Sequence, residues 1–191
     1  MKRLAATILS IAALLGTVAL SAQSMYALVD LNLKNAGGTT IGIITPGTKL
    51  AIESQTPGSA NVTITGWQPK AAAGVIYENI DSQIALVRLT DSSGVNVVGS
   101  KADPYGATWN QVQVSGTVAA NMLVTTVASI WSAGAQFYSQ KCSQCHTLHQ
   151  PSEFTANQWP GIVGSMAHNA QLSGSQEDLV VRYLQAHART P

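Results

Sequence analysis

Hydrophobic and polar residues alternate along residues 26–118 of this chain. Apolar residues recur two positions apart in six short stretches, at 31–33, 41–43, 50–52, 62–64, 95–97 and 112–114. This period is typical of strands with one buried face. Turn-forming residues separate the stretches, for example Pro46-Gly47 and Pro104-Tyr105-Gly106. The pattern predicts a small all-β domain, either an SH3-like barrel or a sandwich.

Two segments within this region are similar to each other. Residues 62–67 and 112–117 share the order valine, polar, β-branched, hydroxyl, glycine, and a turn containing proline and glycine precedes each. Such a likeness has two interpretations. The β domain contains two SH3-like repeats, or the match is a coincidence within a single domain.

In the second half of the chain the hydrophobic period lengthens to three and four residues. Gly134, Tyr138 and Cys142 recur at every fourth position, which places them on one face of a helix. A last helix is predicted after a cap at Ser173 or Ser175. Its apolar stripe consists of Leu179, Val180, Tyr183 and Leu184. This half is therefore predicted to be all-α.

The first residues resemble a bacterial export signal. Lys2 and Arg3 precede an apolar run over residues 4–20, and small residues end it at Ala22. We expect cleavage after Ala22 and a periplasmic location, with an uncleaved membrane anchor as the alternative. The predicted division of the chain is residues 1–22, signal peptide; 23–126, β domain; 127–191, helical domain.

Cys142-Ser143-Gln144-Cys145-His146 is the motif with the clearest chemistry. Cys142 and Cys145 are the only two cysteines of the chain, and C-x-x-C-H is the attachment signature of c-type haem. Two thiols at this spacing can add to the two vinyl groups of one porphyrin, and His146 then offers its imidazole as the proximal ligand of the iron. The motif predicts one covalently bound haem c.

Other uses of two cysteines fit less well. A thioredoxin-type pair needs a βαβ setting, which the surrounding pattern does not have. A structural zinc site needs four protein ligands, and beyond Cys142, Cys145 and His146 only His149 is near in sequence. A lone structural disulfide is the remaining alternative in an exported chain.

A second axial ligand is expected from a short helix that begins near Pro160. Trp159, Ile162, Val163 and Met166 would share its apolar face, and His168 would point away. We therefore predict Met166 as the distal ligand, with His168 as the alternative. Among apolar residues a methionine is ordinarily core filling, but here the haem forms much of the core.

The charge of the chain limits its partners. Removal of Lys2 and Arg3 with the signal changes the formal charge from +1 to 1 − 2 = −1, and no cluster of lysine or arginine follows. Near-neutral charge without such a cluster argues against nucleic acid or an anionic membrane as the partner, so a membrane is expected only if the signal is uncleaved.

Residues 137–187 resemble a known domain, on the strength of Cys142-Ser-Gln-Cys-His146, Phe154-Thr-Ala-Asn-Gln-Trp159-Pro-Gly, Ser165-Met166 and Arg182-Tyr183-Leu184-Gln185-Ala186-His187. The similarity is to the C-terminal monohaem domain of the pentahaem cytochromes of periplasmic trimethylamine N-oxide and dimethyl sulfoxide reductase systems. It implies an all-α, class-I-like cytochrome c fold. This sequence contains a single C-x-x-C-H, so the tetrahaem, quinol-oxidising part of that family is not implied.

Three functions follow from these observations. The first is a one-electron carrier, not an enzyme, in a respiratory chain that the resemblance indicates to be anaerobic. Its donor would be a membrane quinol dehydrogenase or another cytochrome, and its acceptor a periplasmic reductase. The second is a haem-based sensor with a dissociable distal ligand. The third is a peroxidase-like enzyme with an open iron, for which no distal His–Arg pair is evident.

Overall fold

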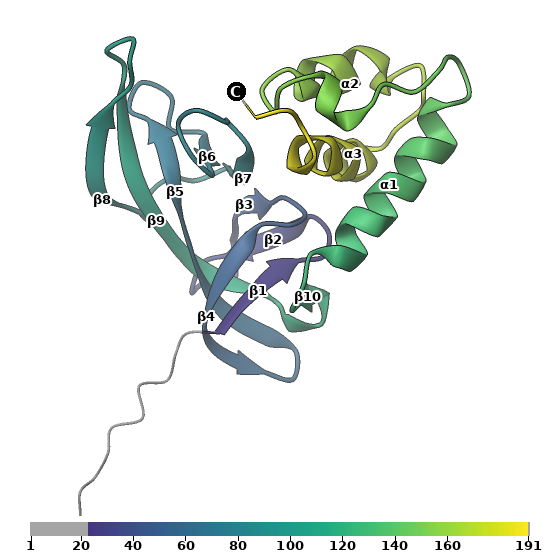
Figure 1. Cartoon of the computed structure of the whole chain (residues 1–191). Helices are drawn as coiled ribbons and strands as arrows, with labels where there is room; N and C mark the ends of the chain where they lie inside the picture. Colours follow the sequence, from purple (N-terminus) through teal and green to yellow (C-terminus); the bar gives the residue numbers. More distant parts are fainter. Residues whose placement is uncertain (1–22, 191) are drawn as a thin grey trace, which may run out of the picture.

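A single antiparallel sheet of ten strands dominates the computed structural model, which describes residues 23–190 (Figure 1). Strand accounts for 39% of the structure and helix for 26%. The strands are β1 (Gln23–Ala27), β2 (Leu31–Lys34), β3 (Thr40–Ile44), β4 (Lys49–Thr56), β5 (Ser59–Pro69), β6 (Val75–Tyr77), β7 (Ala85–Leu89), β8 (Val95–Ala102), β9 (Thr108–Ala119) and β10 (Leu123–Val124).

The sheet closes into a barrel because β9, next to last in the strand order, also pairs with a strand from the middle of that order. It borders β2 and β8, and it also pairs with β5 along its whole length. Inward-facing residues of these two long strands are fully buried, among them Val62, Ile64, Val112 and Val114. The alternation of apolar residues in the sequence is thus the alternation between the barrel core and its surface.

The two similar segments of the sequence are partners in this pairing and not copies of a domain. In the antiparallel register Ile64 lies opposite Val114, and Val62 lies opposite Gly116. The interpretation as two SH3-like repeats is therefore wrong. Two antiparallel strands that bury the same kind of side chain on the same face come to have similar patterns, and this produced the likeness.

Two glycines let neighbouring strands approach closely. A Cβ atom at Gly66 would lie 2.5 Å from the carbonyl oxygen of Tyr77, and one at Gly116 would lie 2.6 Å from that of Lys34. Both distances are far below van der Waals contact. Glycine in a strand interior commonly marks such a close backbone approach, and here it permits the curvature of the barrel.

Three α-helices follow the barrel: α1 (Ala128–Cys142), α2 (Trp159–Ala167) and α3 (Gly174–Ala186). Short 3-10 turns lie at Ala120–Met122 and Pro151–Glu153. A capping box starts α3, because the Ser173 hydroxyl accepts from the Gln176 amide and the Gln176 side chain accepts from the Ser173 amide. The helices share a core made of Tyr138, Trp159, Val163, Val180 and Leu184.

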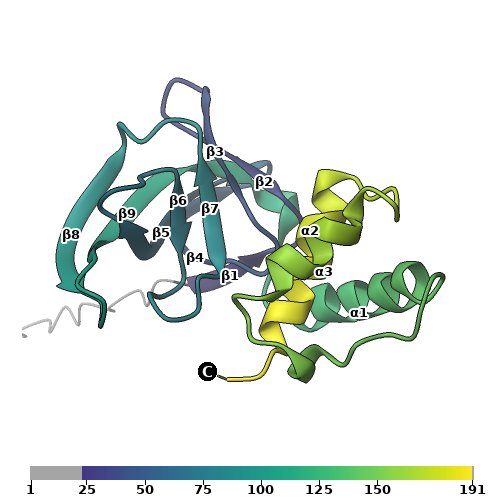
Figure 2. The ribbon, with the colours of Figure 1, turned by 90° about the horizontal axis from the view of Figure 1, so that it is seen from above.

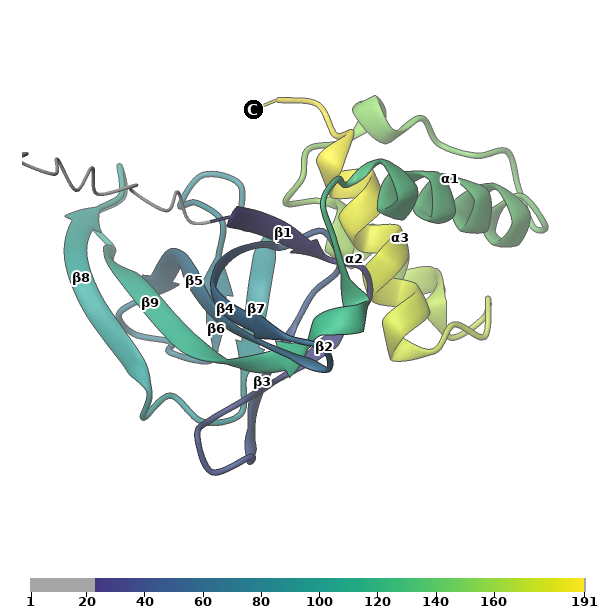
Figure 3. The same cartoon turned by 90° about the horizontal axis from the view of Figure 1, so that it is seen from below.

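Polar contacts join the helices to the barrel, and we call this contact zone the seam. The buried Arg182 of α3 donates from Nε to the carbonyl of Pro46 at 2.9 Å, and Arg88 of β7 forms an ion pair with Asp178 of α3. Near the start of α2, Asn157 donates to the carbonyl of Asp81 at 2.8 Å. In Figures 2 and 3, α3 lies between the barrel and α1.

The predicted fold class, a small β domain followed by an all-α class-I-like cytochrome c domain, is wrong. The structure is mostly β, with a six-stranded barrel and three helices. The helices also pack on the barrel, because α3 buries Arg182 against it and the Trp131 ring of α1 covers Gly47. Local periodicity predicted the elements but carried no information about these contacts between distant parts of the chain.

No helix within residues 23–190 is long and apolar enough to cross a membrane. The predicted signal peptide, residues 1–22, lies outside the described residues.

Candidate haem-binding site

The C-terminal end of α1 carries the two cysteines. Cys142 is the last residue of the helix and is half-buried, and Cys145 follows one turn later and is exposed. The residues between them form a turn, in which Ser143 Oγ donates to the carbonyl of Ser139 at 2.5 Å. Both thiols are free. Burial, and to a smaller extent the neighbouring Cys145, raise the pKa of Cys142, so this thiol is protonated at neutral pH.

His146 stands beside the thiols with one ring nitrogen engaged. Its Nδ1 lies 2.7 Å from the carbonyl oxygen of Thr147, a distance at which an Nδ1–H donates to that carbonyl. The proton is then fixed on Nδ1, and the lone pair of Nε2 is left for a metal ion. Metal-binding histidines commonly have this arrangement, in which a backbone carbonyl orients the ring.

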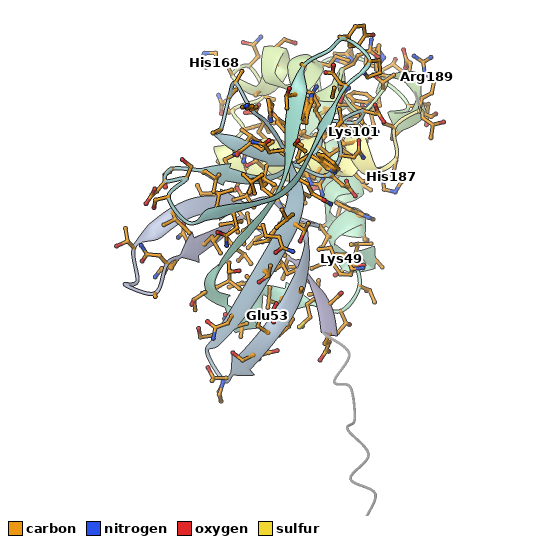
Figure 4. The ribbon with its side chains drawn as sticks, turned by 90° about the vertical axis from the view of Figure 1, so that its left-hand side faces the viewer. Lys49, Glu53, Lys101, His168, His187 and Arg189 are labelled. Atoms are coloured by element: carbon orange, nitrogen blue, oxygen red, sulfur yellow. The ribbon has the colours of Figure 1, made fainter. Side chains whose placement is uncertain are left out.

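Met166 reaches the same place from the other side. A cleft of about 200 Å³ lies between the end of α1 and α2, and we call it the α1–α2 cleft. It is lined by Lys141, Cys142, Cys145, His146, Met166, Asn169 and Ala170. The structure therefore brings together all four residues that the sequence predicted for the site. His168 is exposed, does not line the cleft, and lies at the edge of the molecule in Figure 4.

The inner end of the cleft is apolar and aromatic. A narrower hollow continues from it between Tyr138, Trp159, Val163 and Leu172. The phenol of Tyr138 donates to the carbonyl of His149 at 2.9 Å, and the indole of Trp159 donates to the carbonyl of Pro151 at 3.0 Å. Burial is the main reason that the pKa of Tyr138 rises to about 12. Tyr138 and Trp159 thus line the site, and their hydrogen bonds hold the loop that follows His146.

His149 is held in place by contacts that the sequence analysis did not predict. Its Nδ1 lies 3.0 Å from both carboxylate oxygens of Glu153, and its ring packs edge-on against Phe154 at 5.2 Å between centroids. The signal that could have predicted this pair is that Glu153 is the acidic residue nearest to His149 in the sequence. The pair holds His149 beside His146, with 5.8 Å between the ring centroids.

These residues suit a covalently attached haem. The site offers two free thiols at the C-x-x-C spacing, an imidazole whose Nε2 is available, and a thioether across an apolar cleft, which are the groups that c-type haem attachment uses. Among the described residues no cluster of three or more histidine, cysteine or acidic side chains is arranged to hold a bare metal ion.

Comparison with known proteins agrees with this chemistry. Residues 19–123 match the family model described as TorC third cytochrome c domain, and residues 138–191 match the model described as dihaem cytochrome c. The cytochrome c-type protein TorY of Haemophilus influenzae is 27% identical over 130 residues, which is 66% of this chain and 35% of TorY. TorC of Escherichia coli K12 is 22% identical over 151 residues, 77% of this chain and 39% of TorC.

This chain thus spans less than two fifths of the length of the curated relatives it matches. No solved structure matches it. The matched segment 19–123 contains neither cysteine nor histidine, so the haem-binding motif of this chain lies entirely outside that segment.

The site and these matches define a c-type cytochrome, a protein that binds haem c covalently and transfers electrons. More particularly, the chain belongs to the TorC-like cytochromes, the family of the TorC third cytochrome c domain.

Proposed function

We propose that this chain is a periplasmic one-electron carrier with a single haem c, bound in the α1–α2 cleft. One observation carries the proposal: the paired thiols and the imidazole of the C-x-x-C-H motif face the Met166 thioether across one apolar cleft. The count of one haem rests on the sequence, since the chain contains two cysteines and one haem c consumes two.

Each side chain has a defined role in this proposal. Cys142 and Cys145 would form the two thioethers, and His146 would bind the iron through Nε2, with the carbonyl of Thr147 fixing its ring. Met166 would hold the iron from the other wall of the cleft. When bound, the haem supplies a one-electron iron couple, and methionine ligation raises its reduction potential. If His146 and Met166 both held the iron, no coordination position would be left for a substrate, and electrons would cross at the exposed edge of the cleft.

The partners follow from the family and from the sequence resemblance. We propose a membrane quinol dehydrogenase or another cytochrome as donor, and a periplasmic reductase of an anaerobic respiratory chain as acceptor. The names of the relatives support a cytochrome c-type role. We also propose that residues 127–191 are the haem-bearing part and that residues 23–126 orient it toward a partner.

The direct experiment is expression with export in a bacterium that matures c-type cytochromes, followed by intact mass measurement. The mass of the mature chain should exceed that of the polypeptide by one haem, and acid-acetone should extract no haem. The double variant Cys142→Ser/Cys145→Ser should be haem-free after the same treatment, and the matched control Ser143→Ala should retain one haem. Extractable haem in the wild-type protein, or a second covalent haem, would refute the proposal.

A further inference from the structure

Arg182 is a buried arginine with most of its hydrogen-bonding capacity unused. The residue is 5% exposed, and its Nε donates to the carbonyl of Pro46 at 2.9 Å. A guanidinium has five N–H donors, and four of them are on the two Nη atoms. Within residues 23–190 the Nη atoms have no hydrogen-bond partner and no ion pair, yet they are not enclosed by protein atoms. The charged end of Arg182 therefore faces open space at the seam.

Two hollows at the seam share Arg182 as a lining residue. The first has a volume of about 380 Å³ and lies between α3 and the barrel. Its charges balance, because Arg88 is paired with Asp178 and the carboxylate of Glu177 offsets the guanidinium of Arg182. The second has a volume of about 440 Å³ and lies over β1, β4 and β5; we call it the Arg182 pocket.

The Arg182 pocket contains two cations and one acid. Lys49 lines it from β4, and Glu78 lines it from the segment after β6. Neither forms an ion pair with another described residue. Burial lowers the pKa of Arg182 to about 10, and the attraction of Glu78, followed by that of Asp178, opposes this effect. The stronger attraction of Glu78 indicates that the guanidinium lies toward the Arg182 pocket, whose net formal charge is positive.

The remaining polar groups of the pocket are hydroxyls on the outer face of the barrel. They belong to Ser24, Tyr26, Thr63 and Thr65, and the other lining residues are Gly47, Ala51 and Leu86. Thr65 Oγ1 accepts from the side chain of Gln113 at 3.2 Å, so its own proton is available for donation. A volume of about 440 Å³ is typical of pockets that hold small organic molecules, which a few polar groups orient.

A carboxylate is the group that best matches the free end of Arg182. The Nη–H groups can donate side by side to two carboxylate oxygens, and such paired, charge-assisted hydrogen bonds are strong. A buried charge without a partner is costly, so a bound carboxylate would also stabilise the seam. We propose that the Arg182 pocket binds a small organic carboxylate, with the carboxylate group on Arg182 and Lys49 beside it. This inference concerns the seam and does not depend on the proposed function.

The test titrates the purified, exported protein, with its haem kept reduced, and follows the backbone amides by ¹H–¹⁵N NMR. The probes are three carboxylates of increasing size, acetate, lactate and benzoate, each compared with its neutral amide at equal ionic strength. At least one carboxylate should shift the amides of Gly47, Thr63 and Thr65, and it should bind at least about tenfold more tightly than its amide. Equal affinity for acid and amide, or no shift at these positions with any probe, would overturn the inference.

Two variants test whether the carboxylate occupies the pocket. Arg182→Met should abolish the shifts, and the amide spectrum shows whether this less stable variant is folded. Ala51→Phe keeps Arg182 and fills the pocket from the half-buried middle of the sheet face, so it should also abolish binding. Shifts that persist in Ala51→Phe would overturn the inference, even if Arg182→Met does not fold.

A second pair of variants separates local recognition from the general charge of the protein. Lys49→Gln should weaken carboxylate binding by about threefold, as expected for the loss of one exposed charge beside the ligand. The matched control Lys101→Gln removes an exposed lysine of β8 outside the pocket and should bind like the wild-type protein. Equal effects of the two substitutions would overturn the inference.

Discussion

Gly134 of α1 and Tyr183 of α3 touch directly where the two helices cross. A Cβ atom at position 134 would lie 2.6 Å from the Cβ of Tyr183 and 3.1 Å from its Cγ. The neighbouring atom is the stem of the tyrosine, which cannot swing aside as the end of a flexible side chain can. The crossing of α1 and α3, which positions the cysteines at the end of α1, therefore requires glycine at this position.

The first prediction concerns this crossing. Gly134→Val should lower the free energy of unfolding by about 1–3 kcal/mol, because the added methyl groups force the helices apart. Urea unfolding followed by tryptophan fluorescence measures the change. Gly161→Ala in α2 is the control, since no atom lies within 4 Å of a Cβ there, and alanine should be neutral or slightly stabilising. Equal stability of Gly134→Val and wild type would show that the crossing tolerates a side chain.

A second prediction concerns Asp30, half-buried near the start of α3. Burial, and then the nearby carboxylate of Asp178, raise the pKa of Asp30 to about 6, while Ser175 and Arg88 act in the opposite direction. The folded protein therefore holds this proton more tightly than the unfolded chain. Its stabilising contribution is complete below the ordinary aspartate pKa and is lost as the pH rises through about 6.

The asparagine of Asp30→Asn stays neutral at every pH, so this variant should not lose stability as the pH rises through about 6. We expect it to raise the free energy of unfolding at neutral pH by about 1 kcal/mol, a figure reduced for the solvent exposure of the side chain. Unfolding in urea at about pH 5 and about pH 7.5 makes the comparison. The control is Asp91→Asn. Hydrogen bonds from Ser93 lower the pKa of Asp91, so this substitution should lower the free energy of unfolding at neutral pH and not raise it. A variant Asp30→Asn that is no more stable than wild type at neutral pH would contradict the assignment.

The third prediction separates the seam from the haem-binding part. A fragment of residues 127–191, fused to a bacterial export signal, should still acquire covalent haem, because all four site residues lie within it. Arg182→Met should destabilise the full chain by about 1–3 kcal/mol through loss of the buried hydrogen bond to Pro46, yet leave the fragment nearly unchanged. A haem-free fragment beside a haem-bearing full chain would show that the barrel belongs to the haem core.

Sequence periodicity predicted much of the β half but not how it closes. The short stretches at 62–64 and 112–114 do lie within the two long strands β5 and β9. Their pairing with each other was missed because a period of two reports which face is buried and not which strand lies alongside. The same limit produced the incorrect repeat and the incorrect fold class.

In the site, spacing predicted more, because its residues lie close together in the sequence. The helical period placed Met166 on the apolar face of α2 and His168 away from it, and the structure has Met166 in the cleft and His168 exposed. Arg182 could not be predicted in the same way. In the sequence Arg182 is a single charged residue next to an apolar stripe. The carbonyl to which it donates belongs to Pro46, 136 residues away.

The absorption spectrum of the oxidised protein tests most directly whether Met166 binds the haem iron in the α1–α2 cleft. Coordination of iron by the Met166 sulfur gives a weak long-wavelength charge-transfer band that bis-histidine haems lack. We predict this band in the wild-type protein and in His168→Ala, and its loss in Met166→Ala together with rapid binding of carbon monoxide and a lower reduction potential. The contrary result is a band unaffected by Met166→Ala, or an iron that opens to carbon monoxide only in His168→Ala.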